Sequence, residues 1–132
     1  MGRTIQEQLD LLDETVKYYS EDVTRRGFNE ELKMCEYKTD EGKMCAVGRC
    51  IDQNVMDYDK YNRSTTAKML ISKIGQNIFK EEYRGFSFEL WRKLQDIHDS
   101  WLNWNQNGIT NRGMGNVSAL RAQIKKGCFN NR

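Results

Sequence analysis

Apolar residues near the start of the chain recur at alternating steps of four and three: Ile5, Leu9, Leu12, Val16, Tyr19 and Val23. This spacing places them on one side of an α-helix. Thr4 and Glu7 have the spacing of a capping box, in which each side chain satisfies a free backbone N–H at a helix start. The pattern predicts a first helix from Thr4 to about Arg25, before Gly27.

Residues 33 to 50 follow a different pattern, which predicts a β-hairpin. Residues 34 to 39 alternate in character before the turn-forming run Asp40–Lys43. The second arm, Met44–Gly48, is small and apolar, and its last glycine marks a bulge or a close approach of the backbone. Residues 52 to 63 show no period and are expected to form a surface loop.

Three further segments have helical spacing. Ser64 or Thr65 is expected to cap a second helix, and Gly75 favours its early end. Their expected inward residues are Ala67, Leu70, Ile71, Ile74 and Ile78, then Leu90, Leu94, Ile97, Trp101 and Trp104, and finally Val117, Leu120 and Ile124. The whole pattern predicts one α+β domain over residues 1–132, mostly α, with about four helices packed around one β-hairpin.

The ends of the later helices also have recognisable signals. The third helix begins at Ser87, where Phe86 and Trp91 have the positions of a hydrophobic staple, and it stops between residues 103 and 108. Asn116 or Ser118 is expected to cap a short last helix, which Gly127 closes.

Composition limits the classes of function. No apolar run approaches the length of a membrane span, and no secretory signal is visible, so we expect a soluble intracellular protein with no membrane partner.

The 21 Lys and Arg against 19 Asp and Glu give a net charge of +2. This balance falls short of a dedicated nucleic-acid binder, so we expect no nucleic-acid partner. Acidic residues gather before residue 23 and basic residues after residue 120, an asymmetry that typically only keeps helix faces solvated.

The cysteines stand at positions 35, 45, 50 and 128. In a reducing cell we expect them to be free. Cys35, Cys45, Cys50 and His98 could together supply four zinc ligands, but their spacing does not match structural zinc sites, so we expect no metal and no cofactor. Cys45 and His98 could also form a nucleophile and base, although Asp99 is poorly placed to orient its helical neighbour. We therefore expect no catalytic residues.

The run Arg112–Asn116, placed in a loop before the last helix, has features of a phosphate site: free backbone N–H groups, two glycines and an arginine. Trp101 or Trp104 could stack on a base beside it. The alternatives are that the glycines only form a turn and that the tryptophans fill the core. The candidate ligand-binding residues are His98, Trp101, Trp104, Asn105, Arg112, Gly113, Gly115 and Asn116.

Two motifs carry a resemblance to known proteins. The first combines Cys35-x-Tyr37 with Gly42-Lys43-x-Cys45-Ala46-Val47-Gly48, and the second is Leu94-Gln95-x-Ile97-His98-Asp99. Together they resemble a group of small, largely uncharacterised bacteriophage proteins with a CxY…GxxCAVG hairpin and a downstream LQxxHD helix, over about residues 5 to 104. The resemblance implies an accessory protein made in the cytoplasm of the infected bacterial host.

Three classes of function follow. The first is a non-enzymatic phage protein that inhibits a host defence process by binding, with a nucleotide-type signalling molecule as the preferred target and a homo-oligomer interface completing the site. The second is a protein–protein inhibitor, for instance of a host defence protein, or a nucleic-acid accessory factor. The third is a thiol enzyme that uses Cys45 and His98.

Overall fold

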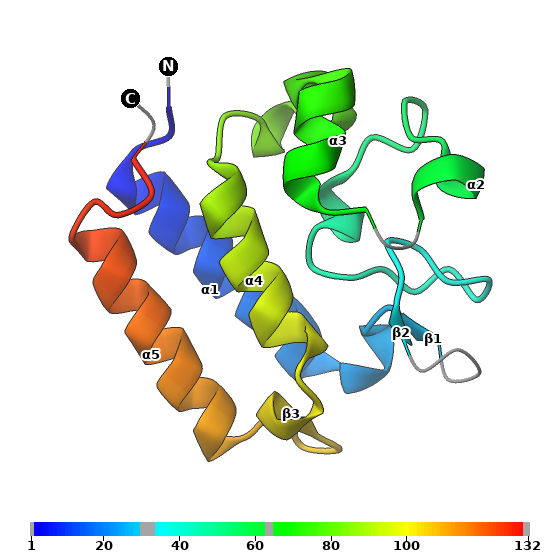
Figure 1. Ribbon diagram of the computed structural model, residues 1–132. Coiled ribbons are helices and arrows are strands. Elements are labelled where there is room, and N and C mark those ends of the chain that lie inside the picture. Colours follow the sequence, from blue (N-terminus) through cyan, green and yellow to red (C-terminus); the bar gives the residue numbers. More distant parts are fainter. Residues whose placement is uncertain (1, 30–33, 63–64, 131–132) are drawn as a thin grey trace.

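The computed structural model describes residues 2–29, 34–62 and 65–130 (Figure 1). Its α-helices are α1 (Ile5–Glu21), α2 (Tyr58–Tyr61), α3 (Ala67–Ile74), α4 (Phe88–Asp99) and α5 (Asn111–Lys125). Strand β1 (Phe28–Asn29) pairs antiparallel with β2 (Met34–Cys35), and β3 (Trp104–Asn105) with β4 (Gly108–Ile109). Short 3₁₀ helices span Val23–Arg25, Gly48–Cys50, Gln76–Ile78, Glu81–Tyr83 and Trp101–Asn103. The α+β class, mostly α, is confirmed.

The long helices form one side of the molecule. In Figure 1, α1 and α5 lie side by side and α4 passes in front of α1, whereas α3, α2 and the β1–β2 pair lie on the side of α4 away from α5. The start of α1 contacts the segment that follows α5, because the Gln8 side-chain amide donates a 3.0 Å hydrogen bond to the Asn130 side-chain oxygen. α4 is therefore central, with α1 and α5 on one side and α3 on the other.

The local helix signals of the sequence are largely present. Thr4 and Glu7 form the predicted capping box of α1. The helix ends at Glu21 and not near Arg25, because Asp22 is extended and its carboxylate caps the 3₁₀ turn that follows. Ser87 caps α4, and Phe86 packs edge-on against Trp91 with ring centroids 5.8 Å apart, as the staple predicts.

The core contains residues from every main helix. Trp91 is fully buried and stacks on Phe79 at 4.7 Å between ring centroids. The other large, fully buried side chains are Gln8, Leu12, Tyr19, Ile51, Leu70, Ile78, Leu90, Leu94, His98 and Ile124. Packing on both sides of α4 fixes its orientation, which matters because this helix lines the cavity described below.

The predicted hairpin at residues 33 to 50 is displaced. β2 pairs with β1, and the turn at Asp40–Lys43 is closed by one antiparallel bridge, Lys38–Met44, with a 2.7 Å bond from Thr39 N–H to the Lys43 carbonyl. Beyond Met44 the chain turns into the 3₁₀ helix Gly48–Cys50. The second arm leaves the hairpin there because the backbone at Gly48 packs directly against the backbone of Tyr37. A Cβ on Gly48 would lie 2.0 Å from the Tyr37 carbonyl oxygen. The expected close approach at Gly48 is confirmed.

The segment after this turn also departs from the prediction. The expected surface loop at residues 52 to 63 contains the short helix α2 and the buried Met56. Thr66, and not Thr65, caps α3, while Ser64 lies outside the described residues. Gly75 ends α3 as predicted, because its φ of 95° is a conformation that other residues rarely adopt.

Candidate functional site

A cavity of about 480 Å³ lies along α4, within the size range of ligand pockets in proteins. We call it the α4 groove. The helix contributes residues over its whole length: Phe88, Glu89, Trp91, Arg92, Gln95, Asp96 and Asp99. At 1.5 Å per residue, the distance along the axis from the first to the last is about 16 Å. The site is therefore elongated.

The opposite wall comes from two other parts of the chain. It consists of Glu36, Tyr37, Cys45, Val47, Asn62, Thr65, Thr66, Ala67 and Lys68. The Tyr37 hydroxyl donates a hydrogen bond to the Thr65 carbonyl and joins these parts. Among the described lining residues, four are acidic (Glu36, Glu89, Asp96 and Asp99) and two are basic (Lys68 and Arg92). The groove thus combines apolar and aromatic surface with an excess of carboxylates.

Gln95 connects the two walls of the groove by a hydrogen bond. Its side-chain oxygen accepts a 3.2 Å hydrogen bond from the Val47 N–H, and its side-chain amide donates a 2.6 Å bond to Asp99 Oδ1. The two motifs that carry the phage resemblance therefore meet at the α4 groove, although 48 positions separate these two residues.

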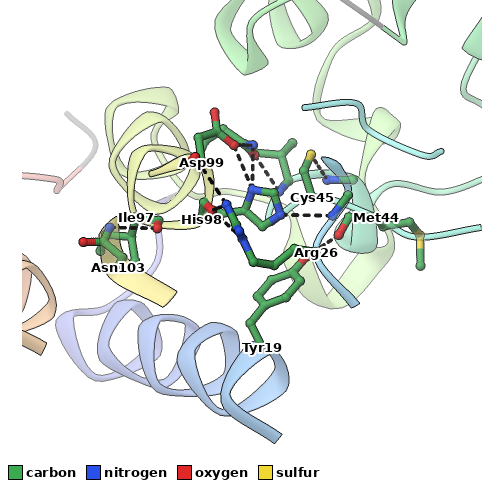
Figure 2. A network of polar contacts seen from close by, with 12 residues as sticks. Tyr19, Arg26, Met44, Cys45, Ile97, His98, Asp99 and Asn103 are labelled. Carbon is green, nitrogen blue, oxygen red and sulfur yellow. Dashed lines mark hydrogen bonds and ion pairs between the residues drawn. The ribbon is translucent and has the colours of Figure 1, made fainter. Parts of the chain in front are cut away.

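His98 anchors the start of the β1–β2 region to α4 (Figure 2). Its Nε2 accepts a 3.2 Å hydrogen bond from the Gly27 N–H. Its Nδ1 lies 2.8 Å from Asp99 Oδ1, and Arg26 donates to the His98 carbonyl at 2.9 and 2.6 Å. These bonds hold the backbone at Arg26 and Gly27 against the C-terminal end of α4.

The contact between His98 and Asp99 corrects the prediction that Asp99 is poorly placed. The angle of about 100° between neighbouring helical residues separates the starting directions of their side chains. At the end of α4 the ends of these two side chains turn toward each other.

The protonation of His98 follows from these partners. Burial lowers the pKa of His98, more than its bond to Asp99 raises it. Because Nε2 accepts from a backbone N–H, the proton of the neutral ring is on Nδ1, facing the carboxylate. With both nitrogens engaged, the ring has no free nitrogen to act as a base toward Cys45.

The buried cysteines have the properties of core residues. Burial raises the pKa of the Cys45 thiol to about 12, and it does the same for Cys50. The nucleophilic form of cysteine is the thiolate, which is scarce at neutral pH when the pKa is this high. The geometry therefore argues against the thiol-enzyme alternative.

The zinc alternative has no support in the described part of the chain. No group of three or more His, Cys, Asp or Glu residues is placed there to hold a metal ion. The side chain of Cys35, one of the four hypothetical ligands, lies outside that part.

Within the described residues, no helix has the length and apolar character to cross a membrane.

The phosphate-site prediction placed residues 112 to 116 in a loop, and this placement is wrong. α5 begins at Asn111, capped by Thr110, whose Oγ1 accepts a 3.1 Å bond from the Gly113 N–H. The early start is possible because Gly113 lets the helix approach Asn103: an added Cβ would lie 2.6 Å from the Asn103 carbonyl oxygen. The N–H groups expected to cradle a phosphate are thus part of a helix.

None of the eight candidate residues lines the α4 groove. His98, Trp104 and Gly113 are buried, with the Trp104 indole N–H donating to the Ile97 carbonyl at 2.9 Å. The exposed members are Trp101, Asn105, Arg112, Gly115 and Asn116. Asn116 lines a second cavity, of about 280 Å³, between α4 and α5 and donates to Asn103 Oδ1.

The candidate ligand-binding residues do not include those that line the α4 groove. Tyr37, Cys45, Val47, Gln95 and Asp99 all belong to the two motifs, so the motifs themselves were the available signal. Tyr37, Val47 and Gln95 entered the prediction of function only through the resemblance, whereas Cys45 and Asp99 were also considered in the thiol-enzyme alternative. Comparisons with known protein families, with curated proteins and with solved structures find no match to this chain.

Proposed function

We propose that this protein is a phage accessory protein that acts by binding, and that it inhibits a host defence process by holding a segment of a host protein in the α4 groove. The observation that carries the proposal is the groove itself, a cavity of about 480 Å³ formed where the two motifs meet. The phage resemblance supports the place of action, the cytoplasm of the infected bacterium.

The shape of the groove favours a protein segment. It is lined along three turns of α4 and has aromatic and aliphatic residues on both walls, among them Tyr37, Val47, Phe88 and Trp91. Grooves of this kind accept the apolar face of a peptide, whose side chains fill pockets spaced along the helix. Large exposed apolar residues rimmed by polar ones are typical of such interfaces, and Phe88 at one end is 39% exposed.

The charge of the groove favours this second class of function over the nucleotide hypothesis. Phosphate groups are repelled by carboxylates, which outnumber cations four to two among the described lining residues. The nucleotide hypothesis stays a prediction with its own test, a thermal shift with cyclic and ADP-ribose-type nucleotides. A ligand at 100 times its Kd would add about 2.7 kcal/mol to the free energy of unfolding.

A homo-oligomer remains a separate prediction, which sedimentation velocity of the purified protein tests.

The experiment that tests the function is a plating assay. Bacteria that carry defined defence systems express the wild-type protein, and the plating of a phage blocked by each defence is counted. We expect rescue against at least one system and its loss in Phe88→Glu, which puts a charge into the groove. The matched control is Val55→Glu, because Val55 is 40% exposed and does not line the groove. Failure to rescue against every system, or full rescue by Phe88→Glu, would contradict the proposal.

A further inference from the structure

We propose that the α4 groove recognises an amphipathic helical segment that carries a basic residue, and that this residue pairs with Asp96. This inference names the chemistry of the partner and rests on the proposed function of the groove as a protein-binding site. It commits to a cationic amphipathic helix and excludes an acidic or uniformly polar segment.

The length of the groove sets the size of the segment. The lining residues of α4 extend for about 16 Å, which an α-helix of about 11 residues matches. A helix that lies in a groove uses apolar residues at positions i, i+3 or i+4, and i+7. We therefore expect a segment of three turns with two or three apolar anchors.

The Phe88 end of the groove provides the apolar half of the site. Phe88 is at the first position of α4, and the Lys68 ammonium lies 5.1 Å from the centre of its ring. Trp91 and Tyr37 line the same cavity. Phe88 is 39% exposed, whereas Trp91 and Tyr37 are buried, so Phe88 provides the aromatic surface that an apolar anchor would cover. The anchors of the segment are therefore expected at this end.

Asp96 provides the charged contact. It lines the α4 groove and also the second cavity, and within the described part of the chain no hydrogen bond or ion pair occupies its carboxylate. Partial burial raises the pKa of Asp96, the nearby Asp99 raises it further, and Arg92 and Lys93 oppose the rise. A cation from a partner would stabilise the charged carboxylate and so oppose the effects of burial and of Asp99.

The net charge of the chain indicates that any preference for a basic segment comes from the groove itself. The net charge of the protein is +2, so a basic segment gains nothing from long-range attraction to the molecule as a whole. The attraction of the segment must therefore come from carboxylates in the groove. Removal of one of these carboxylates should weaken binding by a measurable amount.

The test is a selection of displayed random peptides, about 12 residues long to cover the groove, on the immobilised full chain. We expect the enriched peptides to share apolar residues at helical spacing and a Lys or Arg at one fixed position. When the selection is repeated on Asp96→Lys, we expect Asp or Glu at that position. The matched control is Asp10→Lys, which reverses an exposed carboxylate on α1 outside the groove and should leave the consensus unchanged.

The affinity of the best selected peptide gives a second measurement. We expect Asp96→Asn to raise its Kd by about two- to five-fold, the size of an ion pair open to solvent, with the effect declining in salt. No consensus, a consensus without a basic position, or a basic position that survives Asp96→Lys would overturn the inference. Since the selection uses only purified protein, its result is independent of the plating assay, and the two proposals can fail separately.

Discussion

The side chain of Gln95 on α4 accepts a hydrogen bond of 3.2 Å from the backbone N–H of Val47. Val47 is 1% exposed, so its N–H has no access to bulk water at this position. The bond joins the two walls of the α4 groove and connects the two motifs that the sequence places far apart.

Removal of this contact should destabilise the protein. Gln95→Ala leaves the buried N–H of Val47 without its acceptor, which costs about 1 to 3 kcal/mol. The free energy of unfolding, measured in denaturant, should fall by this amount. Gln123→Ala, an exposed glutamine on α5, is the control and should change it by less than about 0.5 kcal/mol. Equal effects of the two substitutions would show that the bond to Val47 contributes nothing.

Two glycines of α5 should respond in opposite directions to alanine. At Gly113 an added Cβ would lie 2.5 Å from Ile109 Cγ1 and 2.6 Å from the Asn103 carbonyl oxygen, so Gly113→Ala should cost about 1 to 3 kcal/mol. At Gly115 nothing lies within 4 Å, and Gly115→Ala should stabilise the helix by about 0.5 to 1 kcal/mol. Thermal unfolding of both variants checks the pair. A loss of stability in Gly115→Ala would contradict the exposed helical position.

Stability should fall in acid because of His98. Burial holds the pKa of His98 in the folded protein below its ordinary value of 6.5. As the pH falls through that value, the unfolded chain binds the proton first. The contribution of His98 is thus complete above about pH 6.5 and is lost below it, by at most about 1.4 kcal/mol per pH unit.

The measurement compares denaturant unfolding of the wild type and His98→Gln at about pH 7.5 and about pH 5. The wild type should lose more stability on acidification than the variant, whatever the stability of the variant at neutral pH. The same pH dependence in both would rule out a buried, neutral histidine.

The cysteines should differ in reactivity. Cys128 is exposed, whereas Cys45 and Cys50 are buried with pKa values of about 12. Iodoacetamide at mildly alkaline pH should therefore modify Cys128 in the folded protein and reach Cys45 and Cys50 only after denaturation. Mass spectrometry of peptides separates the sites. Rapid labelling of Cys45 in the folded protein would revive the thiol-enzyme alternative.

The sequence predicted the features that depend on near neighbours. The capping box of Thr4 and Glu7, the staple of Phe86 and Trp91, and the helix ends at Gly75 and Gly127 are all present. Each involves residues a few positions apart, so periodicity and capping rules contain the necessary information.

The errors arise where distant segments pack. The start of α5 at Asn111 depends on the contact of Gly113 with Asn103, and the turn after Met44 depends on the contact of Gly48 with the Tyr37 backbone. In both cases a glycine allows two backbones to meet. The sequence placed Gly113 in a loop, and it predicted the close approach at Gly48 without the 3₁₀ turn that accompanies it. The bond between Gln95 and Val47 has no local signature either, so the groove could not be derived from spacing.

The most direct test of the central claim is photo-crosslinking in living bacteria. A photoreactive phenylalanine replaces Phe88 in the α4 groove, and in a second variant it replaces Trp101, which is 75% exposed and outside the groove. The account predicts that illumination joins the Phe88 variant to a host protein, that the crosslink is lost when Asp96→Lys is added, and that the Trp101 variant does not capture this protein. Capture of the same protein only from position 101, or from neither position, would contradict the claim that the α4 groove is the binding site.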